Sequence, residues 1–221
     1  MHPLDGAIER VVRAREHLSD LKIRVAAIRW DKIRGVTIKK QRVRTPFPPN
    51  KWAYANVVYA GGADFPPPII SILVGEIIYN LRAALDYLVY ELACFDAKHI
   101  VEDTQFLIED FEKDFLSHSK RRLKGINSSH IAAIRRLQPF DRCDWTKRLR
   151  DISNPDKHMQ LTIVDAPISF GPPIGGSEAV VDVNQVASVQ VIFDDGMPVV
   201  ETLEQLISQV AKTLRDFDSE F

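Results

Sequence analysis

The 221-residue sequence is poor in cysteine and has no spaced metal-ligand motif. Its two cysteines, Cys94 and Cys143, lie far apart, so neither a disulfide framework nor a zinc site is expected, and both are predicted to be reduced thiols. The six histidines are scattered, without the HxxxH or HExxH spacing that typically holds a catalytic metal. The sequence therefore predicts no metal site and no cofactor.

Motifs for phosphate loops, nucleophilic catalysis and membrane spans are also missing. The glycine pairs at 61–62 and 175–176 lack the Lys-Ser/Thr that follows in a phosphate-binding loop, and no serine or cysteine lies in a nucleophile motif. The longest apolar stretch, 65–78, is too short and too interrupted by prolines to span a bilayer. The first residues lack the basic and apolar regions of a signal peptide, so we expect a cytoplasmic protein with no membrane contact.

The sequence does have an ordinary globular composition and an uneven charge pattern. Hydrophobic residues make up 45% and charged residues 27%, which argues against global disorder. Residues 1–50 and 118–160 are basic, whereas 51–117 and 161–221 are acidic. The two basic segments could form one surface for phosphates. Pairing with the acidic segments across the fold explains them as well, and it is the commoner arrangement.

Apolar periodicity predicts a chain that contains both long helices and short strands. Apolar residues spaced by three and four predict helices over 4–28, 69–94, 109–116, 128–137, 141–153 and 200–217. Runs rich in β-branched residues, bounded by turn residues, predict strands over 35–44, 52–59, 161–164, 179–184 and 188–193. The predicted fold class is α+β: a helical core with a long central helix, plus a β layer from an early hairpin and late strands.

The length of the chain suits one large domain or two very small ones. We expect a single α+β domain over 1–221. Its parts are predicted to be a helical core over about 1–30 and 69–158, β segments over about 36–59 and 161–193, and a C-terminal helix over about 200–217.

Polar residues interrupt the central helix at Asn80, Arg82 and Asp86. Arg82 and Asp86 are four residues apart, so they share a helix face and can form an ion pair. Asn80 lies close to the apolar stripe, and a buried carboxamide without hydrogen bonds costs roughly 1–3 kcal/mol. If Asn80 is buried, another segment should therefore supply its partner. The cluster is either a polar pin that fixes helix register or one wall of a polar site.

A second polar cluster ends the fifth predicted helix. Asn154 precedes Pro155, and residues before proline avoid the α region, so the helix is expected to break or kink there. Arg150, Lys157 and His158 are close neighbours in sequence. His158 stands at the boundary with a predicted strand, where functional side chains are common. A lone histidine is more often structural than catalytic, but the charged neighbours of this one favour function as strongly as structure.

The segments 80–86 (NLRAALD) and 149–158 (LRDISNPDKH) resemble an uncharacterised bacterial family with the helix motifs NLRxALD and NxDKH. More distantly, they resemble HEPN domains, which are helical bundles. Many HEPN domains are metal-independent ribonucleases of toxin–antitoxin and phage-defence systems, and they are often dimeric. Their signature is an arginine and a histidine separated by four to six residues near a helix end. In this chain seven residues separate Arg150 from His158, and Pro155 lies between them.

The resemblance implies a protein that acts on RNA or nucleotides in bacterial stress or phage defence, and at its most specific a metal-independent ribonuclease. In that role His158 would transfer the proton, while Arg150 and Lys157 would bind phosphate. The substrate site would be shaped and oriented by Asn80, Arg82, Asp86 and Asn154. The implied partners are RNA or a nucleotide, a second copy of the chain in a homodimer, and an antitoxin or other regulatory protein.

Two other interpretations of the same residues stay open. In the first, the protein is a non-catalytic module whose polar helix face holds a small anionic ligand or a partner protein. In the second, the two clusters form one buried network that joins two helices. The structural interpretation predicts that removing His158 or Asn80 lowers stability by roughly 1–3 kcal/mol. The ribonuclease interpretation instead requires His158 to be accessible in a positive cleft.

Overall fold

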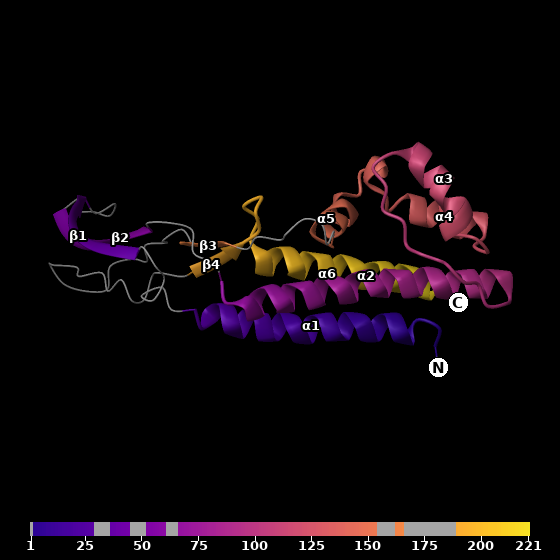
Figure 1. Cartoon of the computed structure of the whole chain (residues 1–221), viewed down its shortest axis with the longest axis horizontal. Helices are drawn as coiled ribbons and strands as arrows, with labels where there is room; N and C mark the ends of the chain where they lie inside the picture. The colour runs from indigo at the N-terminus through magenta and orange to yellow at the C-terminus, as the bar shows by residue number, and fades with distance from the viewer. Residues whose placement is uncertain (1, 29–35, 45–51, 61–65, 154–161, 166–188) are drawn as a thin grey trace. The chain divides into compact units, whose positions relative to one another are not determined.

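A computed structural model of the chain describes residues 2–28, 36–44, 52–60, 66–153, 162–165 and 189–221 (Figure 1). The chain divides into two compact units. The first comprises Met1–Leu21, Ser71–Met159 and Val200–Phe221, and the second comprises Lys22–Ile70 and Gln160–Val199. The expectation of one domain over 1–221 stays a prediction.

Helices account for most of the described residues. They are α1 (Asp5–Ala26), α2 (Pro68–Ala97), α3 (Glu112–Arg122), α4 (Ser128–Arg135), α5 (Asp144–Ser153) and α6 (Val199–Asp218), with a 3-10 turn, η2, at Pro139–Asp141. Each of the six predicted helices is confirmed, with shifted ends. The third begins later than predicted because Phe111 has an extended backbone conformation. The fifth begins after Arg142, whose left-handed conformation separates it from the 3-10 turn.

Three long helices, α1, α2 and α6, lie side by side and build the core of the first unit (Figure 1). α2 is buried over much of its circumference, as its dense apolar pattern predicts. Its buried apolar side chains in this unit are Leu73, Val74, Ile77, Ile78, Leu81, Ala84, Leu85, Leu88, Val89, Leu92 and Ala93. Burying each leucine or isoleucine contributes roughly 1.5–3 kcal/mol, so this helix is the main source of hydrophobic stabilisation.

The two other long helices each bury one stripe against this core. The α1 stripe consists of Ala7, Val11, Ala14, Leu18 and Leu21. The α6 stripe includes Leu203, Leu206, Ile207, Val210, Leu214 and Phe217. Because each stripe repeats every three or four residues, the opposite faces of α1 and α6 stay in contact with water.

The fully buried side chain of Gln138 links two parts of the chain by hydrogen bonds: the segment before α3 and the end of α4. The Gln138 side chain donates from Nε2 to the carbonyls of Leu107 (2.8 Å) and Ile134 (3.1 Å). Its Oε1 accepts from the backbone N–H of Glu109 at 2.9 Å. Gln138 is 0% exposed, so these bonds offset the cost of burying its amide. One side chain thus connects the segment before α3 with the last turn of α4.

The strands form two separate antiparallel pairs. β1 (Val36–Arg44) pairs with β2 (Trp52–Ala60), and β3 (Thr162–Asp165) pairs with β4 (Val189–Ile192). The register of the first pair places Val36 opposite Ala60. These positions agree with the predicted strands, except the one predicted over 179–184, which lies outside the described residues.

The predicted α+β class with a β layer is nevertheless wrong. The described part of the chain is mostly helical, and its strands do not assemble into a layer. The physical reason lies in α2, whose apolar surface is covered by the other helices of its unit. A core closed by helices needs no sheet to cover it. The strand-forming residues therefore predict the positions of individual strands correctly. They do not show whether those strands assemble into a layer.

Candidate functional site

The structure tests only part of the second predicted cluster. Asn154, Lys157 and His158 lie outside the described residues. Arg150, on α5, bonds to two carboxylates: its Nη1 lies 2.9 Å from Asp110 Oδ2, and its Nη2 lies 2.9 Å from Asp151 Oδ1. Burial alone would lower the pKa of Arg150, but the hydrogen bonds to both carboxylates outweigh it, and the pKa is raised. The Arg150 guanidinium is therefore already paired with two carboxylates of the same chain.

Arg82 and Asp86 share a face of α2, as predicted, and both form hydrogen bonds with the backbone of Phe106. Arg82 Nη2 donates to the carbonyl of Phe106 at 3.3 Å, and the N–H of Phe106 donates to Asp86 Oδ1 at 2.9 Å. Burial lowers the pKa of Arg82, against the charge of Asp86. Burial also raises the pKa of Asp86, against the Phe106 N–H and the charges of Arg82 and Arg122. The pair fixes the segment after α2, and both of its residues are half-buried.

Asn80 is only 6% exposed and has a partner on another helix. Its Nδ2 donates to the carbonyl of Glu76, one turn earlier, at 2.8 Å. Its Oδ1 accepts from Arg10 Nη1 of α1 at 3.3 Å. The expectation that a buried Asn80 needs a partner from another segment is confirmed. The structure thus splits the first predicted cluster: Asn80 bonds to α1, whereas Arg82 and Asp86 bond to Phe106.

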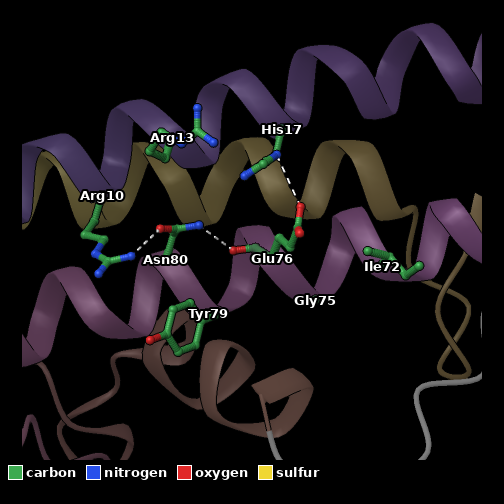
Figure 2. Close-up of a pocket in the computed structure, with 8 residues that line it drawn as sticks. All are labelled: Arg10, Arg13, His17, Ile72, Gly75, Glu76, Tyr79 and Asn80. Carbon is green, nitrogen blue, oxygen red and sulfur yellow. Dashed lines mark hydrogen bonds and ion pairs between the residues drawn. The ribbon is translucent and has the colours of Figure 1, made fainter.

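Arg10 and Asn80 lie in an open cleft between α1 and α2, which we call the α1–α2 cleft (Figure 2). Its volume is about 500 Å³. The cleft is lined by Arg10, Arg13 and His17 of α1 and by Ile72, Gly75, Glu76, Tyr79 and Asn80 of α2. In Figure 2, Arg10 and His17 reach from α1 toward α2. Gly75 has no atom within 4 Å of the position of an added Cβ, so the floor of the cleft is open there.

Arg10 is the best-oriented cation of the cleft. Its guanidinium carbon lies 5.8 Å from the centre of the Tyr79 ring and 5.6 Å from that of Tyr87, both within the range of cation–π attraction. A hydrogen bond with Tyr87 raises the pKa of Arg10, and burial opposes this effect without outweighing it. Together with Asn80 Oδ1, these groups fix where the guanidinium points while leaving its side chain in contact with water.

The other charged groups of the cleft are held more weakly. Arg13 Nη1 lies 2.6 Å from Glu16 Oε2, but both side chains are about half exposed, and such a pair contributes little to stability. His17 Nδ1 lies 3.4 Å from Glu76 Oε2. The cleft therefore has two arginines and a histidine along one wall, and the carboxylates near them can be exchanged for another anion at modest cost.

The residue spacing in the first helix indicates this charged wall, although the sequence analysis did not predict it as part of a site. Arg10, Arg13 and His17 are spaced by three and four, so they share one face of the first helix, beside its apolar stripe. That spacing alone could not show which helix lies opposite. The pairing of α1 with Asn80 is a long-range contact, and it turns a charged helix face into the wall of a cleft.

Comparison with known protein families, with curated proteins and with solved structures finds no match. The resemblance to HEPN domains and to the family with NLRxALD and NxDKH motifs therefore stays a prediction. Within the described part of the chain, no three His, Cys, Asp or Glu side chains are grouped as metal ligands would be. By length and composition alone, α2 could cross a membrane, but half of the apolar window is buried in the protein. Core helices share these properties, so location stays a prediction too.

Proposed function

We propose that the protein binds RNA or nucleotides, and that the α1–α2 cleft holds a phosphate of the ligand. The proposal keeps the predicted substrate class and moves the binding site from α5 to α1 and α2. Arg150, the phosphate ligand predicted on α5, is already bonded to Asp110 and Asp151. A phosphate there would have to displace two carboxylates, whereas Arg10 in the cleft has neutral partners.

The orientation of Arg10 is the observation that carries the proposal. A guanidinium has five N–H donors, so bonds to Asn80 and Tyr87 leave donors that can meet an oxyanion. Arginine binds phosphate through two parallel hydrogen bonds, and a fixed guanidinium loses less entropy on binding than a mobile one. Arg13 lies one turn further along the same wall and adds positive charge for a second phosphate oxygen or a neighbouring phosphate.

Tyr79 favours a ligand that carries a base as well as a phosphate. Its side chain is 64% exposed although it lies on the central core helix, and Ile72, two turns earlier, is 54% exposed. Aromatic rings beside a positive groove stack on bases, whatever the base sequence. A phosphate combined with a planar ring fits this arrangement better than inorganic phosphate alone does.

The alternative is that the polar residues of α2 are purely structural, and one observation favours it for part of the cluster. Arg82 and Asp86 are engaged with the backbone of Phe106, so they hold the fold together rather than face a ligand. Asn80 belongs to the cleft through Arg10. Ribonuclease activity through His158 stays a prediction, since the proposal for the cleft requires binding and no reaction.

Fluorescence anisotropy with a labelled single-stranded RNA and a labelled mononucleotide tests the proposal. At low salt the wild type is expected to bind, and Arg10→Gln should weaken binding roughly tenfold through one lost charge-assisted contact. The slope of log K against log salt should fall by about 1. Arg15→Gln is the matched control, because it removes the same charge from α1 outside the cleft lining.

Two results would overturn the proposal. One is a wild type that binds neither probe at low salt. The other is an Arg10→Gln variant that binds as tightly as Arg15→Gln, with both variants folded as judged by their melting temperatures.

A further inference from the structure

A second cavity of the first unit lies between α4 and α6 and shares no lining residue with the α1–α2 cleft. Its volume is about 260 Å³. The lining residues of one wall fall within 129–137, on α4 and just after it, and those of the other wall fall within 213–220, at the end of α6. The cavity is therefore a separate candidate site, and its ligand does not depend on the function proposed for the cleft.

Three buried side chains form the floor of this cavity. Thr213, Phe217 and His130 are 4%, 6% and 5% exposed, and the centres of the Phe217 and His130 rings lie 6.4 Å apart. The His130 ring is fixed by a residue outside the lining, because its Nδ1 lies 2.7 Å from Asp96 Oδ2 of α2. The backbone N–H of His130 donates to Asn127 Oδ1, which caps α4, at 2.9 Å. The floor is thus formed before a ligand arrives, and a preformed site loses less conformational entropy on binding.

Two groups of opposite charge at the rim have no partner among the described residues. The side chains of Arg136 and Asp216 line the cavity, and within the described part of the chain neither forms an ion pair or a hydrogen bond. Glu220, the other carboxylate of the rim, already lies 3.3 Å from His130 Nε2. One cation and one anion, on opposite walls, are therefore free to meet a ligand.

Other lining residues add an apolar surface and a hydroxyl. Ala133, Leu137 and the Phe217 ring give the cavity an apolar side. The Thr213 hydroxyl forms no hydrogen bond with the described residues, and a hydroxyl can donate to an anion or accept from a cation. A ligand that uses all of these groups must carry one anionic group, one cationic group and an apolar part.

The size of the cavity limits the ligand to a small molecule. A cavity of about 150 Å³ holds benzene, whereas pockets for drug-sized ligands occupy about 300–1,000 Å³. At about 260 Å³ this cavity lies between the two, so it fits a free amino acid better than a whole nucleotide.

We propose that this cavity binds a free α-amino acid with an aliphatic or aromatic side chain. The carboxylate of the ligand pairs with the Arg136 guanidinium through two parallel hydrogen bonds, and its ammonium group pairs with Asp216. The side chain of the ligand packs against Leu137 and Phe217. A carboxylic acid without an amine, or an amine without a carboxylate, would form only one of the two ion pairs.

Backbone amide shifts in ¹H–¹⁵N spectra test the proposal when the protein is titrated with single free amino acids. The probes are valine, leucine, isoleucine, methionine, phenylalanine, tyrosine and tryptophan. At least one of them should shift the amides of 129–137 and 213–220 in a saturable way. The N-acetyl form of that amino acid lacks the ammonium charge, and its amide form lacks the carboxylate. Each should bind roughly tenfold more weakly, because each loses one charge-assisted pair.

Two variants assign each charge of the ligand to its partner. Arg136→Gln should weaken binding of the amino acid roughly tenfold and should no longer distinguish it from the amide form. Asp216→Asn should no longer distinguish the amino acid from its N-acetyl form. Lys212→Gln is the matched control, because it removes a positive charge from α6 outside the cavity lining, and it should bind like the wild type.

The proposal is wrong if none of the seven probes gives saturable shifts at the cavity up to about 10 mM. It is also wrong if the wild type binds the N-acetyl or the amide form as tightly as the amino acid itself. A third contrary result is an Arg136→Gln variant that binds as tightly as Lys212→Gln, with both variants melting at the temperature of the wild type.

Discussion

Asn80 and the pair of Arg82 and Asp86 lie within two turns of α2, yet they make contacts of different kinds. Asn80 meets a half-buried arginine of α1 in a cleft open to water. Arg82 and Asp86 are half-buried and bond to the backbone carbonyl and N–H of Phe106. One short sequence motif thus contributes both to an open cleft, which we propose as a binding surface, and to a structural contact with Phe106. The difference lies in what each face of the helix packs against.

The largest expected effect is on the structural contact with Phe106. Asp86→Ala should lower the free energy of unfolding by about 2–4 kcal/mol, because it leaves Arg82 buried and uncompensated and removes the acceptor of the Phe106 N–H. Urea unfolding measures the loss. The double variant Arg82→Met/Asp86→Leu should be less destabilised than Asp86→Ala, since no charge remains buried. A double variant that is less stable than Asp86→Ala would contradict this account.

Asn80→Ala should have a smaller effect on stability and a larger one on binding. Losing the bond to Arg10 and the bond within α2 should cost about 1–2 kcal/mol. RNA binding should weaken as well, because Arg10 loses one of the groups that orient it. Asp86→Ala, studied under conditions where it stays folded, should bind RNA like the wild type. If the two variants lose affinity equally, the division between the two faces of α2 is wrong.

The smallest effect is a change in the pH dependence of stability. Because the pKa of Asp86 is raised in the folded protein, the folded state binds this proton more tightly than the unfolded state does. Its contribution is full below the ordinary aspartate pKa of about 3.9 and is lost as pH rises through the raised value. The stability of the wild type relative to Asp86→Asn should therefore decrease over that window. Urea unfolding of both proteins from about pH 3.5 to 7 measures it.

The sequence predicted the helices because periodicity is a local property. The α2 stripe and the α1 stripe could be read directly from residue spacing. The absence of a β layer could not be read from the sequence. The strand-forming residues at 36–44 and 52–60 predict a pair of strands, but they do not show what that pair packs against. Local spacing also placed Arg82 and Asp86 on one face correctly.

Contacts between distant segments explain what the sequence did not reveal about the sites. Asn80 could be recognised as needing a partner, but 70 residues separate it from Arg10. His130 and Asp96 are 34 residues apart, and His130 and Glu220 are 90 apart. In each of these pairs, the sequence around one residue does not identify the residue that it contacts. His158, by contrast, has charged neighbours in the sequence, and such neighbours say little about which residues lie near it in space.

The three bonds of Gln138 have a consequence for the order in which the protein opens. The carbonyl of Leu107, the N–H of Glu109 and the carbonyl of Ile134 are all satisfied by one buried side chain. Separating the segment before α3 from α4 breaks these bonds together, and half-open states leave unpaired groups away from water. The stretch from 107 to 138 should thus behave as one cooperative opening unit, with its slowest amides exchanging at a common rate.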